Sequence, residues 1–497
     1  MDTDQRRYRA RNAGRSPIVY PASCILCLWL TGATMAGEPL KLHPDNPHYF
    51  LFRGKPAVLI TSGEHYGAVL NLDFDCVPYL NELQKCGFNL TRTFAGTYRE
   101  IPGSFGITGN TLAPAPNRYC CPWARSDTPG YFDGGNKFDL TKWDAEYFKR
   151  ARDLLAQAAQ RGVVVEFVLF CPNYDEKLWK ASPMNAANNV NGIGNIGLKE
   201  PFTLKDKPLQ EVQDAFVRKI VSELNGYDNL YYEICNEPYF GGVTLEWQAH
   251  IADVIVETQA KLPNKHLLAQ NIANGSAKVD KPNPNVSIFN FHYAKPPDAV
   301  IVNYGLGKAI AFDESGFRGS EDKPYRTEAW DFILAGGAIY SNLDYSYTPD
   351  KEVGTAVPKA PGGGGPALRA QYRILKDFIG GFEFVKMRPC PEAVKGGLPA
   401  GAWARVLAET GKSYALFVHN SPQEKKKDSS KKEPQPAAEP APFNLLLELP
   451  AGSYAAEWIN TLSGEVAKRE EFKHDGGAKT LSSPAYSGEV ALRIVAK

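Results

Sequence analysis

Apolar residues follow two different patterns along this chain, and the change between them comes near residue 387. Before that point, short continuous apolar runs alternate with stretches that have apolar residues at helical spacing. Such runs are typical of strands that are buried on both faces of a sheet. Strands that alternate with helices indicate parallel βα units, and eight such units predict a closed (β/α)8 TIM barrel in the α/β class.

The first part of the chain contains candidates for all eight barrel strands. A hairpin over 48–60 turns at Gly54 and continues into the first strand, and the fourth strand begins at Leu230. The remaining strands are expected at 88–94, 163–170, 266–270, 286–292, 309–312 and 338–347. Helices are expected at 75–86, 139–161 (with Asp139 as the N-cap), 209–224, 247–262, 327–334 and 367–378. Two long loops, 95–138 and 171–204, follow predicted strands, and loops of that length are usually functional or disordered.

After residue 387 the apolar and polar residues alternate in short runs, as in half-buried antiparallel strands. These runs predict a small all-β sandwich domain over 387–497, after a catalytic barrel over 37–386. The stretch at about 422–442 is rich in Lys, Pro, Glu and Ala and has almost no apolar residues. Because it cannot bury enough surface to fold, we expect a disordered insertion there.

The first 36 residues have the order of a secretory signal. Five arginines precede an apolar run at 18–30, and small residues then lead to Ala36. We expect a signal peptide over 1–36 and a secreted or periplasmic protein. No other stretch is long and apolar enough to predict a membrane span.

Charge and cysteine content narrow the function classes. The 56 basic and 55 acidic residues give a net charge of +1, which provides no argument for a nucleic-acid partner. The seven cysteines after residue 36 have no regular spacing and no CxxC pair, so they predict neither a disulfide framework nor a zinc site. The sequence implies no metal and no organic cofactor.

Two glutamates are the candidate catalytic groups. Asn236-Glu237-Pro238 ends one apolar strand, because proline has no N–H for the sheet, and Glu314 ends another strand within Asp-Glu-Ser-Gly. The separation of the two glutamates along the chain suits three compact βα units, which places them at the ends of strands four and seven. Glu166 and Glu233 lie inside apolar strands, so we expect them to be buried partners, for example of Arg92, and not catalysts.

With these motifs, residues 41–381 resemble the clan A glycoside hydrolases, which include the cellulase-like family 5. Arg92 matches the clan's strand-two arginine, and His292-Tyr293 matches its strand-six region. The segment 380–389, which leads into the sandwich, is similar to clan members with a C-terminal accessory domain.

The resemblance implies a role for each of these residues. Glu237 is the expected general acid/base and Glu314 the expected nucleophile of a retaining mechanism. Asn236 would bind a sugar 2-hydroxyl, and Arg92 would keep Glu314 charged and oriented. His292 and Tyr293 would also hold the nucleophile. His65, after the first strand, is a candidate sugar contact.

Two features depart from the family pattern. His292 and Tyr293 are adjacent, so in an extended strand their side chains would point in opposite directions. The tryptophan that commonly follows strand eight is replaced by Asn342-Leu-Asp-Tyr345. Both departures concern sugar binding. Four tryptophans are candidate sugar platforms, although packing is the commoner role: Trp123, Trp179, Trp247 and Trp330.

The physical chemistry of glycoside cleavage supports the pairing of the two glutamates. The glycosidic oxygen leaves only when it is protonated, so one carboxyl must hold a proton near neutral pH. We expect the charge of Glu314 to raise the pKa of Glu237 for that purpose. The predicted function is a secreted retaining glycoside hydrolase that cleaves a polysaccharide or oligosaccharide by double displacement. The alternatives are an exo-acting glycosidase for an unusual terminal sugar and a non-catalytic carbohydrate-binding protein on a barrel scaffold.

Overall fold

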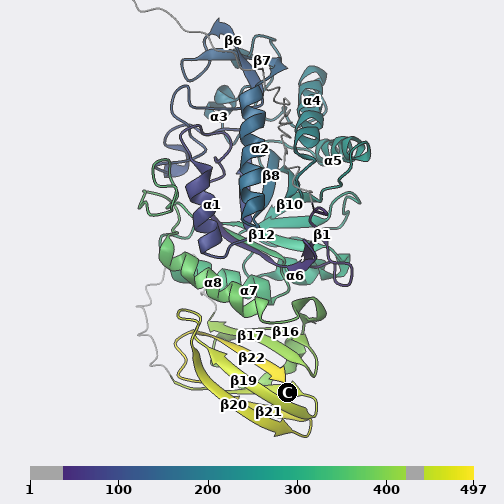
Figure 1. Ribbon diagram of the computed structural model, residues 1–497, viewed down its shortest axis with the longest axis vertical. Coiled ribbons are helices and arrows are strands. Elements are labelled where there is room, and N and C mark those ends of the chain that lie inside the picture. The colour runs from purple at the N-terminus through teal and green to yellow at the C-terminus, as the bar shows by residue number, and fades with distance from the viewer. Residues whose placement is uncertain (1–36, 421–440) are drawn as a thin grey trace, which may run out of the picture. The chain divides into compact units, whose positions relative to one another are not determined.

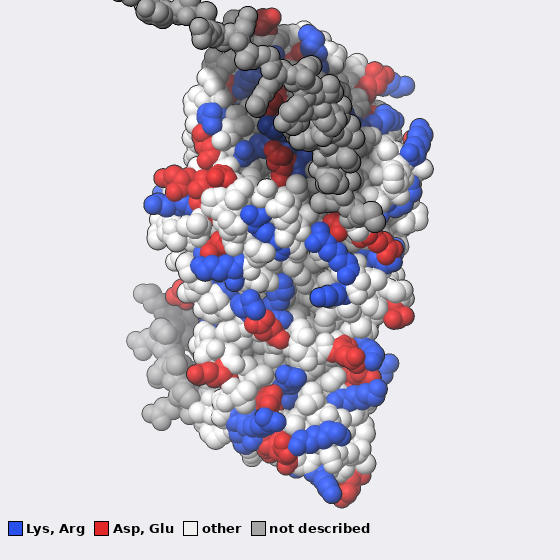
Figure 2. Space-filling view, in the orientation of Figure 1, with Lys and Arg blue, Asp and Glu red and all other residues white. Residues whose placement is uncertain are grey.

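The computed structural model describes residues 37–420 and 441–497 (Figure 1). The expected signal peptide lies outside the described residues, as does the expected insertion except for Ala441 and Pro442. No helix in the described ranges has the length and apolar character needed to cross a membrane. Acidic and basic side chains are intermixed on the face that Figure 2 shows.

Eight parallel strands form the central sheet, in the order β4-β13-β12-β11-β10-β9-β8-β5. Neighbours in this order are consecutive βα units, and β4 returns beside β13, so the sheet curls into the predicted barrel. The strands are β4 (Leu59–Gly63), β5 (Leu90–Phe94), β8 (Val164–Phe170), β9 (Leu230–Cys235), β10 (Leu268–Asn274), β11 (Ile288–His292), β12 (Ala309–Ser315) and β13 (Ile339–Leu343).

A side chain bridges the remaining seam of the barrel, between β4 and β5. The Asn89 side chain accepts a hydrogen bond from the backbone N–H of Ile60 at 3.0 Å and donates one to the carbonyl of Val58 at 2.9 Å. The amide therefore supplies the hydrogen bonds that a strand pair would have made there.

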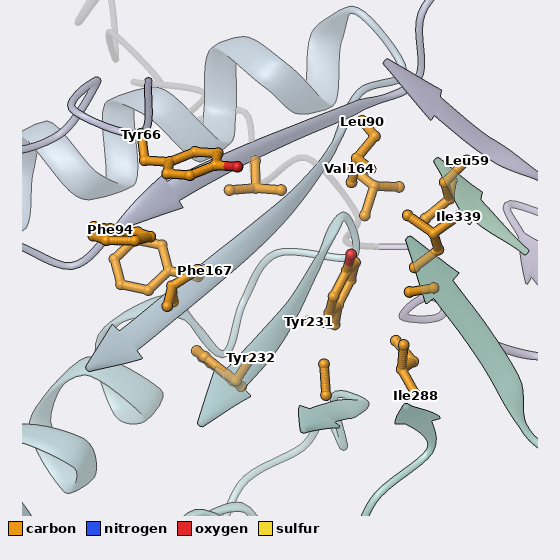
Figure 3. Packing of buried hydrophobic residues seen from close by; sticks show 14 of the residues in the cluster. Leu59, Tyr66, Leu90, Phe94, Val164, Phe167, Tyr231, Tyr232, Ile288 and Ile339 are labelled. Carbon is orange, nitrogen blue, oxygen red and sulfur yellow. The ribbon is translucent and has the colours of Figure 1, made fainter. Parts of the chain in front are cut away.

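Helices cover the outside of the barrel, and apolar side chains such as Leu90 and Ile339 form one layer of its inside (Figure 3). Leu90 and Val164 are opposite each other on β5 and β8, and Leu59 and Ile339 are opposite each other on β4 and β13; all four are fully buried. The helices are α1 (Cys76–Lys85), α2 (Ala145–Gln160), α3 (Glu176–Ala181), α4 (Lys207–Leu224), α5 (Leu245–Ala260), α6 (Asp298–Asn303), α7 (Asp322–Leu334) and α8 (Pro366–Gly380).

The helix expected to begin at Asp139 begins later, and that prediction was wrong. Strands β6 (Trp123–Pro129) and β7 (Asn136–Trp143) form an antiparallel hairpin within the region expected to be a loop followed by a helix. The helix α2 follows, and its N-cap is Asp144, whose carboxylate accepts the N–H groups of Glu146 and Tyr147. Two aspartates in similar contexts are hard to tell apart from sequence alone, and pairing with β6 decides between them.

Two antiparallel sheets follow the barrel. One has the order β14-β16-β17-β22-β19-β20 and the other the order β15-β18-β21, as the prediction of an all-β sandwich required. The strands are β14 (Arg388–Pro389), β15 (Val394–Gly396), β16 (Ala402–Glu409), β17 (Ser413–Asn420), β18 (Asn444–Leu449), β19 (Gly452–Ile459), β20 (Val466–His474), β21 (Gly477–Ser482) and β22 (Glu489–Ala496). A small sheet of β1 (Lys41–Leu42), β2 (Phe50–Phe52) and β3 (Lys55–Ala57) contains the predicted hairpin at Gly54.

The barrel and the sandwich share buried contacts. Trp330 of α7 stacks on Phe417 of β17 with ring centroids 5.5 Å apart, and both side chains are fully buried. Beside them the Asp331 carboxylate accepts hydrogen bonds from Arg405 Nε at 2.6 Å and from His419 Nε2 at 3.0 Å. The apolar core of the barrel therefore continues into β17.

Candidate active site

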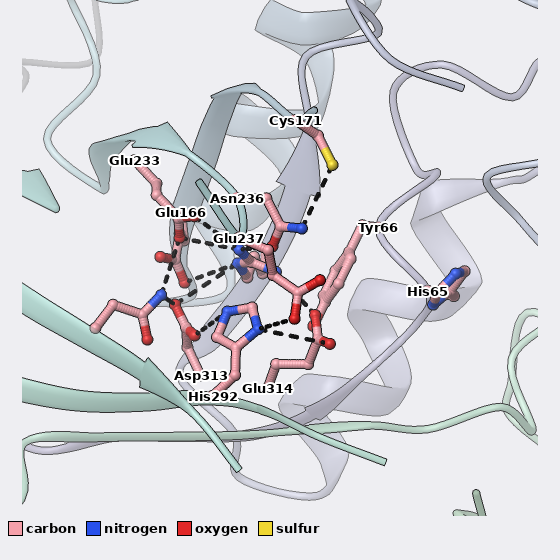
Figure 4. A network of polar contacts seen from close by, with 12 residues as sticks. His65, Tyr66, Glu166, Cys171, Glu233, Asn236, Glu237, His292, Asp313 and Glu314 are labelled. Carbon is pink, nitrogen blue, oxygen red and sulfur yellow. Dashed lines mark hydrogen bonds and ion pairs between the residues drawn. The ribbon is translucent and has the colours of Figure 1, made fainter. Parts of the chain in front are cut away.

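Glu237 and Glu314 meet at the carboxyl ends of the barrel strands. Glu237 is the second residue after the end of β9, and Glu314 is the penultimate residue of β12. One oxygen of each carboxylate and one nitrogen of His292 all lie within 4.8 Å of one another. The structure thus brings together the two glutamates that the sequence singled out (Figure 4).

Three side chains fix the carboxylate of Glu314. The Tyr293 hydroxyl donates to its Oε1 at 2.5 Å, and the Tyr66 hydroxyl donates to its Oε2 at 3.1 Å. Arg92 Nη1 lies 3.5 Å from the same Oε2. These contacts hold both oxygens in place while leaving the carboxylate on the wall of a pocket.

The carboxylate of Glu237 is bound by a different set of groups. The Tyr174 hydroxyl donates to its Oε2 at 2.7 Å, and the Tyr239 hydroxyl to its Oε1 at 3.3 Å. His292 Nδ1 lies 3.3 Å from Oε1. The backbone of Glu237 has a φ of 38°, a left-handed conformation that turns the chain sharply at the end of β9.

His292 connects the two glutamates to a buried aspartate. Its Nε2 lies 3.2 Å from Asp313 Oδ1, and its Nδ1 lies 3.6 Å from Glu314 Oε1. Burial alone would lower the pKa of His292, but the carboxylates of Glu314, Asp313 and Glu237 raise it to about 10. At neutral pH the ring is therefore an imidazolium, with a proton on the nitrogen that faces Glu237.

The pKa of Glu237 differs from the sequence-based expectation. Burial raises the pKa of Glu237. The hydrogen bond and charge of His292 and the hydrogen bond from Tyr174 together lower this pKa by more than burial raises it, so that it lies below its ordinary value. The prediction that Glu314 leaves Glu237 protonated in the free protein was therefore wrong. The proton that the site holds is on His292, one hydrogen-bond length away.

Below these groups, Arg92 sits in a cluster of buried carboxylates. Its Nη2 donates to Glu233 at 2.9 Å and to Asn236 Oδ1 at 2.8 Å, and its Nε lies 3.6 Å from Glu166. This confirms the expectation that Glu166 and Glu233 are buried partners of Arg92. Burial raises the pKa of both carboxyls.

Asn236 uses both ends of its amide inside the protein. Its Oδ1 accepts from Arg92, and its Nδ2 donates to the Tyr174 hydroxyl at 2.9 Å. It lines the pocket, as expected, but it also ties Arg92 to the tyrosine that binds Glu237.

Within residues 37–420 and 441–497, two groups of three side chains have the spacing of metal ligands: Glu237, His292 and Glu314, and also Glu166, Glu233 and Asp313. In the second group the guanidinium of Arg92 already pairs with all three carboxylates. In the first group, ligation would require a neutral imidazole, whereas the surrounding carboxylates favour the imidazolium. Ion pairing accounts for both groups.

The adjacency of His292 and Tyr293 is resolved by the backbone. The strand β11 ends at His292, and Tyr293 has a φ of 50°, so it is not part of the extended chain. The turn brings both side chains toward Glu237 and Glu314 instead of toward opposite faces. A departure from the family spacing is thus compensated by one left-handed residue.

His65 lies apart from the two glutamates, on the other side of Tyr66 in Figure 4. Its Nε2 is 3.4 Å from Glu100 Oε1, and both residues line the same pocket as Glu237 and Glu314. The candidate tryptophan platforms are not at the surface: their exposed fractions are 2 % or less. They pack in the core.

The two glutamates line a small pocket with an accessible volume of about 50 Å³. Its aromatic walls suit the faces of a sugar ring. It is lined by His65, Tyr66, Phe94, Tyr98, Glu100, Phe105, Leu112, Tyr174, Asn236, Glu237, Tyr293, Glu314 and Phe317.

Four residues of the site were missed in the sequence. Tyr66 follows His65 and Asp313 precedes Glu314 in the sequence, and this adjacency to a candidate residue could have identified both of them. Tyr174 and Glu100 come from the two long loops that follow β8 and β5, and nothing in their local sequence distinguishes them. Their position depends on how those loops fold over the barrel.

Comparison with solved structures shows the fold. No protein-family model matches the sequence, and a search of curated proteins finds no match. A glycoside hydrolase structure is 13 % identical with a TM-score of 0.60, covering 93 % of this chain and 97 % of its own. A family 5 glycoside hydrolase of Bacteroides vulgatus ATCC 8482 is also 13 % identical with a TM-score of 0.57, covering 92 % and 93 %. The resemblance to clan A glycoside hydrolases expected from the motifs is thus confirmed at the level of the fold, across most of the chain.

Proposed function

We propose that the protein is a secreted retaining glycoside hydrolase that cleaves an O-glycosidic bond of a polysaccharide or oligosaccharide. The observation that supports this proposal best is the approach of Glu237 and Glu314 to within 4.8 Å. Retaining enzymes have carboxyl groups about 5–5.5 Å apart, whereas inverting enzymes leave about 6.5–9.5 Å for a water molecule. The short separation therefore favours double displacement.

In the first step, Glu314 attacks the anomeric carbon while the bond to the leaving oxygen breaks. The two tyrosines and Arg92 fix the carboxylate for in-line attack, so little orientational entropy is lost at the transition state. Glu237 delivers a proton to the leaving oxygen. That proton reaches Glu237 from His292 Nδ1, across their 3.3 Å contact, and leaves a neutral imidazole that keeps its proton on Nε2, 3.2 Å from Asp313 Oδ1.

In the second step, Glu237 acts as a base. The ester formed on Glu314 carries no charge, and Glu237 takes a proton from the water that attacks the anomeric carbon. The proton then returns to the pair formed by Glu237 and His292, and the ionised Glu314 is regenerated.

Export is part of the proposal and rests on the basic, apolar and small-residue order of residues 1–36. The fold shared with solved glycoside hydrolases supports the reaction class. The aromatic pocket supports a carbohydrate substrate.

Covalent trapping tests the assignment of the nucleophile. A panel of 2-deoxy-2-fluoro glycosides with activated leaving groups should inactivate the protein, and peptide mass spectrometry should locate the label on Glu314. Glu314→Gln should take up no label, while Asp214→Asn, which changes a carboxylate outside the pocket, should be labelled normally. A label on any other residue would refute the assignment. A wild-type protein that binds glycans, takes up no label and cleaves no glycoside would instead be a carbohydrate-binding protein.

A further inference from the structure

The pocket contains a third carboxylate, Glu100, which takes no part in the double displacement. It is 2 % exposed and lies in the long loop after β5. Asn110 Nδ2 donates to its Oε2 at 2.5 Å, and the Tyr98 hydroxyl donates to its Oε1 at 3.3 Å. Together with the contact to His65, these bonds fix the carboxylate in one orientation on the pocket wall.

The Glu100 carboxylate can accept more hydrogen bonds than the protein itself provides. An ionised carboxylate offers about four acceptor sites, and three of those of Glu100 are filled by Asn110, Tyr98 and His65. His65 is 7 % exposed, and its Nδ1 has no partner among the described residues. A buried polar nitrogen without a partner destabilises the folded protein unless a ligand or water binds it. Two residues of the pocket lining therefore keep unused hydrogen-bonding capacity, one acceptor site on Glu100 and one ring nitrogen on His65.

We propose that His65 and Glu100, held by Asn110, bind two neighbouring hydroxyl groups of an uncharged glycosyl residue. This inference rests on the proposed function and adds the chemical class of the sugar. One hydroxyl donates to Glu100, and the other bonds to His65 Nδ1.

The aromatic contacts of His65 indicate which part of the substrate it meets. Its ring stacks on Tyr66 with centroids 5.6 Å apart, and the Tyr66 hydroxyl binds Glu314. Because Glu314 attacks the anomeric carbon, a residue next to Tyr66 faces the sugar that becomes attached to the protein. His65 and Glu100 therefore select the glycone and not the leaving group.

The charge of the pocket excludes anionic sugars from that position. Its lining has three carboxylates, Glu100, Glu237 and Glu314, and one side chain that can carry a positive charge, His65, which already pairs with Glu100. Arg92 lies behind Tyr66 and is engaged by Glu233 and Asn236. A uronate or sulfate would bring a further negative charge next to Glu100 without a free cation to pair with it.

The test compares neutral and anionic glycones in binding as well as in turnover. The ligands are 4-nitrophenyl glucoside and glucuronide, galactoside and galacturonide, in both anomeric forms, with binding measured by saturation-transfer NMR and cleavage by 4-nitrophenol release. The wild type should bind at least one neutral glycoside at least 100-fold more tightly than its uronide. Glu100→Gln should bind that neutral glycoside about 10-fold more weakly and the uronide more tightly, because the substitution removes one negative charge from the pocket wall.

Asp214→Asn is the matched control, because Asp214 also pairs with a histidine, His250, at 2.8 Å but lies outside the pocket. It should keep the wild-type preference. Deoxy analogues of the bound glycoside provide a second measurement: loss of one hydroxyl should weaken binding to the wild type about 10-fold and to Glu100→Gln much less. Equal or tighter binding of the uronide by the wild type, or an unchanged preference in Glu100→Gln, would overturn the inference. Binding of neutral glycosides with this preference but without cleavage would overturn the proposed function and leave the inference standing.

Discussion

At the scale of single residues, Glu314, the proposed nucleophile, is held by hydroxyl groups as much as by charge. Both oxygens of Glu314 accept a tyrosine hydroxyl, and Arg92 approaches only one of them. Hydrogen bonds to a charged acceptor are worth about 1.5–3 kcal/mol when they are buried. We therefore expect the hydroxyl groups of Tyr66 and Tyr293 to affect the rate at which Glu314 attacks the substrate as well as the orientation of its carboxylate in the free protein.

Removal of the Tyr293 hydroxyl tests this view. Tyr293→Phe should lower kcat about 10- to 100-fold with little change in KM, because the ring still packs while the orientation of Glu314 is lost. Steady-state kinetics on a cleaved glycoside would measure it. Tyr345→Phe is the control, since the hydroxyl of Tyr345 has no hydrogen-bond partner within the described residues. Equal losses in the two variants would contradict the role of Tyr293.

The position of the site proton can be tested by pH. In the wild type, Glu237 and His292 share one proton, which leaves the pair as the pH rises through about 10, the pKa of His292. In His292→Asn the proton must reside on Glu237 alone, and a carboxyl loses it at a lower pH. The basic limb of kcat/KM should therefore move down by several pH units, with a control measurement of folding by circular dichroism at each pH. A basic limb that stays in place would show that His292 does not hold the proton.

At the scale of elements, the strand ends do more than present side chains. Tyr66, Glu237 and Tyr293 all have positive φ angles, of 58°, 38° and 50°, just past β4, β9 and β11. Left-handed backbone costs non-glycine residues about 1–2 kcal/mol each. The turns redirect the chain so that consecutive residues reach the same pocket.

This strain predicts a difference between two pairs of variants. Glu237→Gly should be more stable than Glu237→Ala by about 1 kcal/mol, because glycine adopts positive φ without a penalty. At Glu314, inside β12, the order should reverse, because glycine weakens a strand. Thermal or denaturant unfolding of the four proteins would measure both differences, and the same order at both positions would argue against strain at Glu237.

The elements also show how far sequence patterns reach. Buried strands such as β8 were predictable because every residue of the run is apolar or paired, and the two glutamates were predictable because proline or a turn ends their strands. The β6–β7 hairpin was not, because its strands are only partly buried and its pairing depends on contacts across the long loop. For the same reason Glu100 and Tyr174, which those loops deliver, could not be foreseen.

At the scale of the whole molecule, the helix α7 serves two partners. Its Trp330 packs in the core that continues into β17, and its Arg326 and Thr327 bind the carboxylate of Glu489 on β22 at 2.5 Å and 3.1 Å. The sandwich is therefore joined to the barrel by apolar contacts and by charged contacts, both through α7.

We therefore expect barrel and sandwich to unfold together. Calorimetry should show a single cooperative unfolding transition. Phe417→Ala should lower the free energy of unfolding of the whole protein by about 3–5 kcal/mol, because the substitution opens a cavity against Trp330. Trp403→Ala, which removes a side chain that is 53 % exposed on β16, should have little effect. Two separated transitions would show that 37–386 and 387–497 fold independently.

The contacts of α7 with both the barrel and the sandwich also determine how domains of this protein could be joined to those of other proteins. A chimera that joined a foreign barrel to residues 387–497 would lose the partners of Phe417, His419 and Glu489 at once. A crossover placed between β12 and α7 would instead transfer the sandwich together with the helix that receives it. We therefore expect a chimera that exchanges the sandwich to fold only if the crossover point lies before Asp322, the first residue of α7.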